Sequence, residues 1–357
     1  MSEGLNYAPV ARVTKPVCEH GAFPFAAAYL DHGHIFGMVD NLVAAGGSLS
    51  AVYEPNSKVA NQLLERYPQA RRVANFAEIL QSKEIKLVAA AAVPSLRGPI
   101  GIEVMQHGKD YFTDKCPFVS LRQLQEARKA VQDTGMKYAV CFSERLQNEA
   151  AEFARELIDD GVIGQVVQVL GLGPHRLSPA NRPDWFFQKN QYGGILCDIG
   201  SHQAEQFLTY SDNHAADVIM ARVDNFANPQ TPELEDFGEF SLKGANGCSG
   251  YFRMDWFTPN GLRTWGDGRT TILGTKGFIE CRKYIDLAVS PLRENTVYIV
   301  TDDSEEQHSV SGQIGFPFFP ALILDCLNRT ELAMTQEHSF KAAELSLQAQ
   351  ALADLEV

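Results

Sequence analysis

The sequence predicts an α/β fold, in which a doubly wound parallel sheet is followed by an α+β domain with an open, mostly antiparallel sheet. In the first part of the chain, short runs that are apolar on both faces alternate with helix-like segments, as in a parallel sheet covered on both sides. Beyond residue 166, strand-like segments follow one another with few helices between them. We therefore expect an N-terminal arm over 1–22, a nucleotide-binding type of domain over 23–145, and the α+β domain over 146–357.

The elements of the first domain are expected from apolar periodicity and from capping residues. Asn56 or Ser57 caps a helix that runs through Tyr67, and Gly135 ends the amphipathic helix that begins at Ser120. Pro94 ends an apolar strand, and a helix follows it as far as His107. The expected strands are 24–30, 48–54, 84–94, 110–114 and 138–142, and a further helix is expected over 37–45.

The second domain is expected to consist of hairpins because glycine-rich turns separate its strands, as at 244–247 and 274–277. The C-terminal helices of the chain could pack on the first domain and not on the second. The expected strands are 166–172, 217–227, 236–244, 248–257, a hairpin over 270–289, and 296–301, and the expected helices are 148–160, 316–328 and 339–354.

Composition excludes several classes of protein. The chain has 357 residues, 45% of them hydrophobic, and a formal net charge of −13, which argues against a nucleic acid as the main partner. The N-terminus lacks the apolar core of a signal peptide, and no stretch approaches the roughly 20 apolar residues of a membrane span. Seven scattered cysteines without a C-x-x-C pair favour a reduced compartment, so we expect a cytoplasmic protein.

The turn after the first strand, in the stretch AAAYLDHGHIFGM, allows three interpretations. It could be a pyrophosphate loop at a helix N-terminus, although it holds only Gly33 where the usual fingerprint has three glycines. Asp31, His32 and His34 have the donor types of a metal site, but their spacing in a tight turn converges poorly, so no metal is predicted. It could also be an ordinary turn.

Two further positions lie where the parallel strands should end at the ligand-binding edge of the sheet. Glu54 ends the second strand, 21 residues beyond Gly33. An acid at this position accepts hydrogen bonds from the adenosine ribose and favours NAD over NADP, and a solvated loop carboxylate is the alternative. Lys58 keeps NADP open as the less favoured cofactor. Lys115 follows the strand FTD just before Pro117, and could transfer a proton or orient a substrate, or be an ordinary surface lysine.

The segment YGGILCDIGSHQAEQFLTY places Asp198 and His202 four residues apart, so in one helix they share a face. A histidine beside a carboxylate is suited to take a hydroxyl proton near neutral pH. A helix with an acidic first turn and a buried structural histidine is the alternative interpretation.

This ordered set of motifs resembles the Gfo/Idh/MocA oxidoreductase family, which includes glucose–fructose oxidoreductase and inositol dehydrogenase. The resemblance begins near Phe23 and is most specific from Gly193 to His202, with GTKGFIECRKY as support. It implies a Rossmann domain followed by an open-faced α/β domain. The triplet E-K-P of the family reads here Asp114-Lys115-Cys116 with the proline one position later, and Tyr29 stands near the first glycine of the fingerprint.

The resemblance also implies the roles of individual residues. The catalytic set falls on Lys115, Asp198 and His202. The NAD site would comprise Leu30, Asp31, His32, Gly33, His34, Glu54, Val93, Pro94, Ser95 and Lys115. We expect the N–H groups from His32 to Ile35 to face the pyrophosphate, and Asp31 to turn away or bond to its own turn.

The segment 173–194 would border the substrate. Its aromatic rings suit a sugar or cyclitol, whereas its arginines would also suit a carboxylate, and a packed structural loop is the alternative. The expected substrate-binding residues are Arg176, Arg182, Trp185, Tyr192, Asp198 and His202.

The expected reaction is hydride transfer between NAD and a secondary alcohol of a sugar, cyclitol or glycoside. Family analogy leaves open a redox-neutral glycosidase or lyase that retains tightly bound NAD, and a non-catalytic sugar sensor. It also implies a homodimer or homotetramer. No nucleic acid and no membrane partner are expected, and the N-terminal arm could be disordered or cross to a neighbouring subunit.

Overall fold

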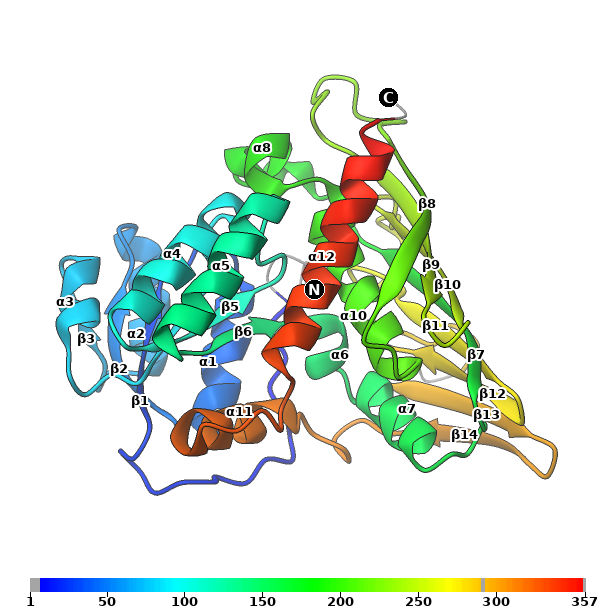
Figure 1. Ribbon diagram of the computed structural model, residues 1–357, viewed down its shortest axis with the longest axis horizontal. Helices are drawn as coiled ribbons and strands as arrows, with labels where there is room; N and C mark the ends of the chain where they lie inside the picture. The colour runs from blue at the N-terminus through cyan, green and yellow to red at the C-terminus, as the bar shows by residue number, and fades with distance from the viewer. Residues whose placement is uncertain (1–6, 290–292, 356–357) are drawn as a thin grey trace. The chain divides into compact units, whose positions relative to one another are not determined.

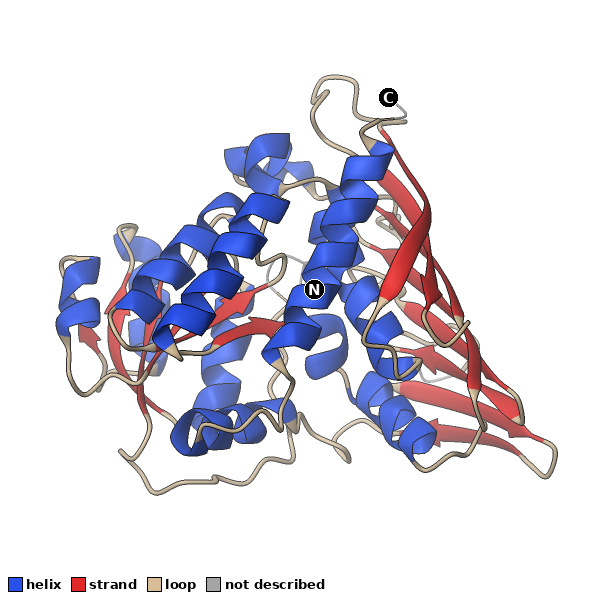
Figure 2. Ribbon diagram, viewed as in Figure 1, coloured by secondary structure: helices blue, strands red, loops and turns tan. Residues whose placement is uncertain are grey.

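The computed structural model describes residues 7–289 and 293–355, which form two compact units. The N-terminal unit contains the described residues up to Cys141 together with 316–340. The C-terminal unit contains the described residues from Phe142 to Gly315 and from Lys341 onward. Each unit is built around its own sheet, shown by the red strands in Figure 2.

The sheet of the N-terminal unit has six parallel strands in the order β3-β2-β1-β4-β5-β6. The strand order reverses between β1 and β4, which is the switch point of a doubly wound fold. Figure 1 shows two of the covering helices, α4 and α5, side by side. The elements are β1 (Pro24–Ala28), α1 (His34–Ala44), β2 (Ser48–Tyr53), α2 (Ser57–Arg66), β3 (Arg71–Arg72), α3 (Phe76–Gln81), β4 (Leu87–Ala90), α4 (Pro94–Gln106), β5 (Asp110–Asp114), α5 (Leu121–Thr134), β6 (Tyr138–Cys141) and α11 (Phe318–Asn328).

The sequence prediction of this sheet is confirmed, including the Asn56 cap of α2 and the left-handed Gly135 that ends α5. Two short elements, β3 and α3, were not predicted, because β3 consists of two exposed arginines without an apolar run. The strand predicted over 84–94 is shorter and ends at Ala90. Pro94 instead begins α4, where its missing N–H costs no hydrogen bond.

The sheet of the C-terminal unit has eight strands in the order β14-β13-β12-β11-β7-β10-β9-β8. All neighbours are antiparallel except β7 and β10, which confirms a mostly antiparallel sheet. Helices α7 and α10 contact strands of this sheet. The elements are α6 (Ser143–Leu146), α7 (Glu149–Asp159), β7 (Val166–Pro174), η2 (Pro179–Asn181), η3 (Asp184–Phe187), α8 (Lys189–Tyr192), α9 (Ile195–Asp198), α10 (Gly200–Tyr210), β8 (Ala216–Asp224), β9 (Phe237–Gly244), β10 (Ser249–Asp255), β11 (Arg269–Gly274), β12 (Gly277–Arg282), β13 (Thr296–Thr301), β14 (Glu305–Ser309) and α12 (Gln336–Ala353), whose residues from Lys341 belong to this unit.

The two faces of the second sheet differ in character. One face of the sheet is covered by the helices. Phe240, Phe252 and Ile272 lie on this face and are fully buried. Leu170, Leu273 and Phe278 point to the opposite face, because the register pairs Leu273 with Phe278 and Leu170 with Thr271. These three side chains are partly exposed. The predicted open sheet face is therefore present in this unit.

The N-terminal arm packs along α1 of its own chain. The Ala11 N–H donates to Asn41 Oδ1 at 3.0 Å, and Asn41 Nδ2 donates to the Pro9 oxygen at 2.8 Å. Farther along, the Val17 N–H donates to the Ala45 oxygen at 2.9 Å. The described part of the arm is thus ordered against the first helix of the N-terminal unit.

Two global features bear on the environment of the protein. All seven cysteines are free thiols, and six of them are buried. Among the described residues, none of the helices combines the length and the apolar character that crossing a membrane requires.

Candidate active site

The turn after β1 is held by backbone hydrogen bonds to the two neighbouring strands. Tyr29 adopts a positive φ of 53°, and its N–H donates to the Tyr53 oxygen at 3.1 Å. The next N–H, that of Leu30, donates to Glu54 Oε2 at 2.7 Å. A tyrosine thus takes a left-handed conformation that usually favours glycine, and the following peptide is fixed by the acid at the end of β2.

Most N–H groups at the start of α1 already have partners, which corrects part of the sequence expectation. The His32 N–H donates to the Ala91 oxygen at 2.9 Å, and the Ile35 N–H donates to the His32 oxygen at 3.2 Å. The His34 N–H points at His32 Nδ1, 3.4 Å away. Among the described residues, no group accepts from the N–H of Gly33, and α1 has no side-chain cap. One open donor at an 11-residue helix N-terminus fits an anion.

Asp31 bonds locally, as expected from the sequence. Its carboxylate accepts from its own N–H and from the N–H of Val93, the residue that caps α4. Ser95, in the first turn of α4, is held from another direction, because Gln123 Nε2 donates to its carbonyl oxygen at 2.8 Å. The loops after β1 and β4 are therefore tied to each other at the carboxyl edge of the sheet.

Glu54 is buried at the carboxyl end of β2 and organises the surrounding backbone. Its Oε2 accepts from Leu30 and its Oε1 accepts from the Asn56 N–H, each at 2.7 Å. Each carboxylate oxygen has a second acceptor position, so two ribose hydroxyls could still donate to it. Arg72 Nη2 lies 3.3 Å from the Glu54 carbonyl oxygen, which brings a cation to this corner. The sequence did not reveal Arg72, because β3 is too short to be recognised.

A buried cluster joins the first loop to the end of β5. Asp114 Oδ1 lies 3.0 Å from His34 Nδ1, and Asp114 Oδ2 lies 3.2 Å from His32 Nδ1. These three residues have the donor types of a metal site, with ligand atoms within 4.8 Å of one another. Arg97 and the Lys115 N–H bind the same two carboxylate oxygens, at 3.3 and 2.8 Å. Because these donors would oppose a cation, we interpret the cluster as a hydrogen-bonded clamp.

Electrostatics keep the clamp in a single protonation pattern. Burial alone would raise the pKa of Asp114, but the nearby His34, Arg97 and His32 hold it well below its usual range. Burial, together with repulsion from His34, lowers the pKa of His32 well below its usual range. Asp114 is therefore ionised and His32 is neutral near pH 7.

Arg97 fixes the turn that carries Lys115. Its side chain is 1% exposed and donates to the Ala92 oxygen at 2.7 Å, to the Cys116 oxygen at 3.1 Å and also to the Lys115 oxygen. The Lys115–Cys116 peptide is cis. Lys115 itself is 4% exposed. Arg97 is thus a positioning residue that the sequence analysis missed, since an arginine inside a helix carries no motif.

Asp198 and His202 do not share one uninterrupted helix, contrary to the sequence prediction. Asp198 ends α9, and Ile199 separates it from α10, which begins at Gly200. The His202 N–H donates to the Ile199 oxygen three residues back, at 3.1 Å. This hydrogen bond spans three residues instead of the four of a regular α-helix, so the helix is interrupted at the junction. Asp198 and His202 are both buried, at 8% and 2% exposure. These two residues belong to the C-terminal unit, whereas Lys115 belongs to the N-terminal unit.

Three of the predicted substrate residues in segment 173–194 have structural bonds. Arg176 Nη2 donates to the carbonyl oxygens of Pro259 and Leu262, and Arg182 Nε donates to the Leu177 oxygen. The Tyr192 hydroxyl donates to the Glu233 oxygen and accepts from the Glu235 N–H, both at 3.0 Å. Trp185 is half-buried and contacts Phe186. These hydrogen bonds fit a packed loop, and substrate binding by Arg176, Arg182 and Tyr192 stays a prediction.

A second buried carboxylate, which the sequence did not reveal, lies in the C-terminal unit. Glu144 Oε2 accepts from Gln203 Nε2 at 3.0 Å and lies 3.3 Å from Lys283 Nζ. His175 Nε2 lies 3.9 Å from the other oxygen, Oε1. Gln203 follows His202 directly on α10, so this network adjoins the predicted catalytic helix. Its members come from four separate elements and loops, and no spacing in the sequence links them.

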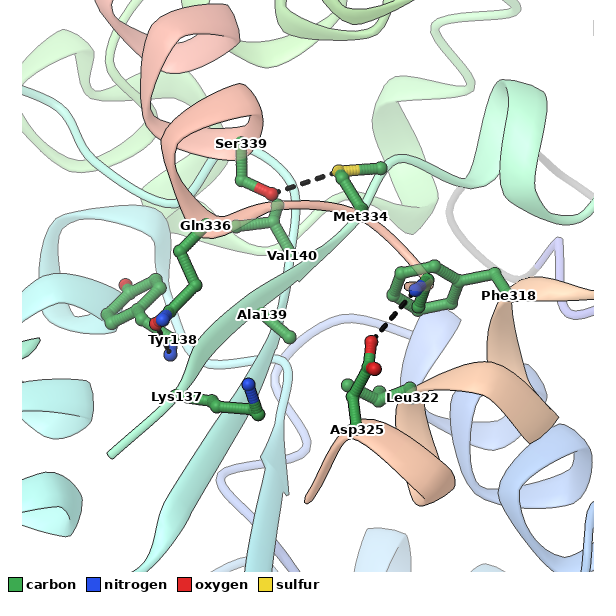
Figure 3. A pocket seen from close by; sticks show the side chains of 11 residues that line it. Lys137, Tyr138, Ala139, Val140, Phe318, Leu322, Asp325, Met334, Gln336 and Ser339 are labelled. Carbon is green, nitrogen blue, oxygen red and sulfur yellow. Dashed lines mark hydrogen bonds between the residues drawn. The ribbon is translucent and has the colours of Figure 1, made fainter. Parts of the chain in front are cut away.

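Two cavities within the units lie away from these residues. The one in Figure 3 has a volume of about 20 Å³, which is room for about one water molecule, and Asp325 and Met334 are among the residues around it. The other has a volume of about 420 Å³. Its lining residues are Arg263, Thr264, Tyr284, Ile285, Arg293, Glu294, Ser309 and Ser311.

Comparison with known families accounts for most of the chain. Residues 25–142 match the oxidoreductase family with an NAD-binding Rossmann fold, and residues 152–280 match the GFO/IDH/MocA C-terminal domain. A crystal structure from Erwinia carotovora atroseptica SCRI1043, assigned as an oxidoreductase, is 46% identical with a TM-score of 0.90. It covers 93% of this chain and 98% of its own.

Relatives of known activity are more distant. The scyllo-inositol 2-dehydrogenase (NAD⁺) of Bacillus subtilis strain 168 is 23% identical over 75% of this chain and 77% of its own. The match to the D-xylose dehydrogenase of Paenarthrobacter nicotinovorans, at 22% identity, spans only 41% of this chain and 39% of that protein. Levoglucosan dehydrogenase in complex with NADH and levoglucosan shares the fold, with a TM-score of 0.75 at 17% identity over 94% of this chain and 97% of its own. The β1 turn, the Lys115 turn and the two sheets thus have a common explanation: the chain belongs to the Gfo/Idh/MocA family of NAD-binding oxidoreductases.

Proposed function

We propose that the protein oxidises a secondary alcohol of a sugar, cyclitol or glycoside, transferring the hydride to NAD. The observation that carries this proposal is the fixed placement of Lys115. The clamp on Asp114 and the three carbonyl bonds of Arg97 hold the turn that presents this lysine at the end of β5. The carboxyl edge of a doubly wound sheet is where a dinucleotide binds.

The N-terminal unit fits NAD in two respects. The open Gly33 N–H at the start of α1 suits a pyrophosphate oxygen, and the two Glu54 oxygens can each accept one more hydrogen bond. Leu30, Asp31, His32, His34 and the loop Val93-Pro94-Ser95 would border the cofactor. Glu54 favours NAD by repelling a 2′-phosphate, whereas Arg72 beside it would favour NADP. We propose NAD because the carboxylate is buried at the strand end.

The bound nicotinamide supplies the hydride acceptor. In the proposed reaction His202 takes the hydroxyl proton and Asp198 orients the substrate or the imidazole. Lys115 holds the reacting oxygen by donating hydrogen bonds from its ammonium group. A positioned acid or base of this kind contributes roughly 10²–10⁴-fold to the rate. Segment 173–194 would border the substrate, with Arg176, Arg182, Trp185 and Tyr192 as its proposed substrate-binding residues, of which Trp185 is half-buried.

The proposal is tested by incubating the purified protein with NAD⁺ or NADP⁺ and scyllo-inositol, D-xylose or levoglucosan. The expected result is reduced cofactor with at least one polyol, faster with NAD⁺. Turnover of a glycoside without net NADH would instead identify a redox-neutral enzyme that retains its cofactor. Binding of a sugar with no turnover would identify a sensor. Either outcome overturns the proposed dehydrogenase.

We propose that the open face of the second sheet forms a contact between copies of the chain, giving a homodimer or homotetramer. Leu170, Leu273 and Phe278 are partly exposed on this face, and contiguous exposed apolar side chains mark interaction surfaces. Sedimentation of the protein should show an oligomer, and Leu273→Glu should shift it toward the monomer. A monomeric parent protein would contradict this assignment.

A further inference from the structure

We propose that the cavity of about 420 Å³ in the C-terminal unit binds the phosphate group of a small phosphorylated molecule. None of the described residues that line it belongs to segment 173–194 or to the proposed catalytic set. The assignment therefore does not depend on the proposed function. Ligand pockets are roughly 300–1,000 Å³ in volume, so this cavity has room for a molecule the size of a sugar phosphate or a mononucleotide.

The cavity lies where several strands of the second sheet begin or end together. The register pairs Arg282, at the end of β12, with Arg269 at the start of β11 and with Thr296 at the start of β13. Thr296 also pairs with Ser309, the last residue of β14. The sheet therefore fixes the ends of the loops that form the cavity. Its wall consists of residues 263–264, 284–285 and 293–294 together with Ser309 and Ser311.

Arg263 and Arg293 bring two positive charges to this cavity. Among the described residues, neither guanidinium has a hydrogen-bond or ion-pair partner, and both side chains are exposed. A guanidinium binds phosphate through paired N–H donors, often with two parallel hydrogen bonds. A phosphate monoester carries a charge of about −1.5 to −2 near pH 7, so two arginines match it better than they match a single carboxylate.

The acids that flank these loops are paired with other arginines. Asp286 lies 2.9 Å from Arg282 Nη1, and Asp267 lies 2.6 Å from Arg269 Nη2. Glu294 is the acidic residue of the described lining, so two arginines and one glutamate give the lining a formal charge of +1. In a chain with a formal net charge of −13, this cavity is a local excess of positive charge that favours an anion.

One hydroxyl of the lining can add a neutral donor. The Ser311 hydroxyl already donates to the Glu294 carbonyl oxygen at 3.1 Å, and the Thr264 hydroxyl donates to the Gly266 oxygen at 2.6 Å. The Ser309 hydroxyl has no hydrogen-bond partner among the described residues. Because a hydroxyl has a single hydrogen to donate, Ser309 is the one that can donate to a phosphate oxygen.

The rest of the wall indicates that the ligand has an organic part. Tyr284 and Ile285 line the cavity and are 6% and 2% exposed. The Trp265 ring contacts the Tyr284 ring, with centroids 4.4 Å apart, and so holds it in place. A sugar or a base can cover this wall while its phosphate meets the arginines, whereas a free phosphate ion leaves the wall uncovered.

The test measures the binding of glucose 6-phosphate, AMP and inorganic phosphate by calorimetry. NADH is present to occupy the proposed dinucleotide site, which could otherwise take a phosphate. At least one organic phosphate should bind tenfold or more tightly than inorganic phosphate, and its affinity should fall as NaCl is raised. Preference for glucose 6-phosphate would identify a sugar phosphate, and preference for AMP a nucleotide. Arg263→Gln/Arg293→Gln should weaken this binding at least tenfold.

A matched control separates this cavity from general charge. Arg222→Gln/Lys243→Gln removes two exposed cations from β8 and β9 of the same unit and should leave the affinity unchanged, with thermal unfolding of each variant as the folding control. Four results would overturn the assignment: equal affinity in the parent and in Arg263→Gln/Arg293→Gln, no binding of either organic phosphate, inorganic phosphate bound as tightly as both, or glucuronate bound more tightly through the same arginines. Absence of polyol oxidation would contradict the proposed function and leave this assignment standing.

Discussion

The two units each bury one carboxylate beside histidine and a cation, and the two carboxylates are bonded differently. Asp114 receives Lys115 N–H and His34 Nδ1 on one oxygen, and Arg97 Nη2 on the other, which also lies 3.2 Å from His32 Nδ1. Glu144 has a hydrogen bond from Gln203 and an ion pair with Lys283 on one oxygen, whereas the other oxygen accepts no hydrogen bond from the described residues and lies 3.9 Å from His175 Nε2. The same chemical group thus holds a turn in one unit and leaves an acceptor open in the other.

This difference indicates how a buried charge can be assigned to stability or to recognition. A saturated carboxylate has no capacity for a ligand, so Asp114 acts through the Lys115 turn that it holds. An unsaturated buried acceptor is destabilising by roughly 1–3 kcal/mol in the free protein, and a hydroxyl donor removes that cost when it binds. Glu144 is therefore expected to contribute less to folding than Asp114 does.

The largest effect should come from the groups that the two carboxylate clusters position. Lys115→Ala and His202→Ala should each lower kcat/KM for the polyol by about 10²–10⁴-fold, because each removes a proposed proton-transfer or oxygen-binding group. Steady-state kinetics at saturating NAD⁺ checks this, with thermal unfolding of each variant as the folding control. Rates within a few fold of the parent in both variants would remove Lys115 and His202 from the mechanism.

The next effect separates the two carboxylates by stability. Asp114→Asn leaves Arg97 buried without its counterion, so the free energy of unfolding should fall by about 3–5 kcal/mol. Glu144→Gln also leaves Lys283 without its ion pair, but Lys283 keeps its hydrogen bond to Gln206 Oε1 and one open acceptor is relieved, so the loss should be smaller. Urea unfolding of both variants measures the difference. If Glu144→Gln proves as costly as Asp114→Asn, the contrast between a fully bonded and an incompletely bonded carboxylate is wrong.

A smaller effect concerns Glu54, a third buried carboxylate, whose two oxygens each have one backbone partner. Glu54→Gln should reduce the preference for NAD⁺ over NADP⁺ about tenfold, because it removes the charge that repels a 2′-phosphate while one oxygen is retained. Arg72→Ala should change NADP⁺ binding and leave NAD⁺ nearly unaffected. Cofactor titrations followed by NAD(P)H fluorescence distinguish these outcomes, and an unchanged ratio in Glu54→Gln would argue against its role at the ribose.

The smallest effect is a pH dependence of stability in the Asp114 cluster. The pKa of His32 is lowered in the folded protein, so its stabilising contribution is complete above the unfolded pKa of about 6.5 and is lost as the pH falls toward the folded value. Between pH 7 and pH 5.5 this should cost on the order of 1 kcal/mol. Asp114, whose pKa is also lowered, adds to the loss only near pH 4 and below. His32→Asn should flatten the slope between pH 7 and 5.5, and an equal slope in that variant would assign the effect elsewhere.

The elements of the fold follow from local patterns that the sequence displays directly. Buried apolar strands and the Ser120 and Gly135 caps of α5 depend on residues close together in the chain. The site depends on contacts between distant residues, and these are less visible. Asp114 was expected only as part of a motif, whereas its bonds to His34 and Arg97 join β5 to a loop and a helix. Glu144, His175 and Lys283 carry no motif, so only the tertiary structure brings them together.

The substrate-binding roles expected for Arg176, Arg182 and Tyr192 stay predictions. Their types and positions suggested substrate binding, but types alone do not show which partner a polar side chain has. In the structure Arg176 Nη2 and Arg182 Nε donate to loop carbonyl oxygens, and the Tyr192 hydroxyl lies between two backbone groups. A polar residue in an aromatic loop is therefore ambiguous until its hydrogen bonds are known.

The most direct test follows the hydrogen that is proposed to move. The protein is incubated with NAD⁺ and scyllo-inositol, D-xylose or levoglucosan carrying deuterium on the ring carbons, and the cofactor is analysed by mass spectrometry. The proposed hydride transfer predicts NADH that has gained one deuterium with at least one polyol, and no such product with Lys115→Ala or His202→Ala above about 1% of the parent rate. Reduced cofactor without deuterium, or no reduction with any polyol despite bound NAD, would contradict it.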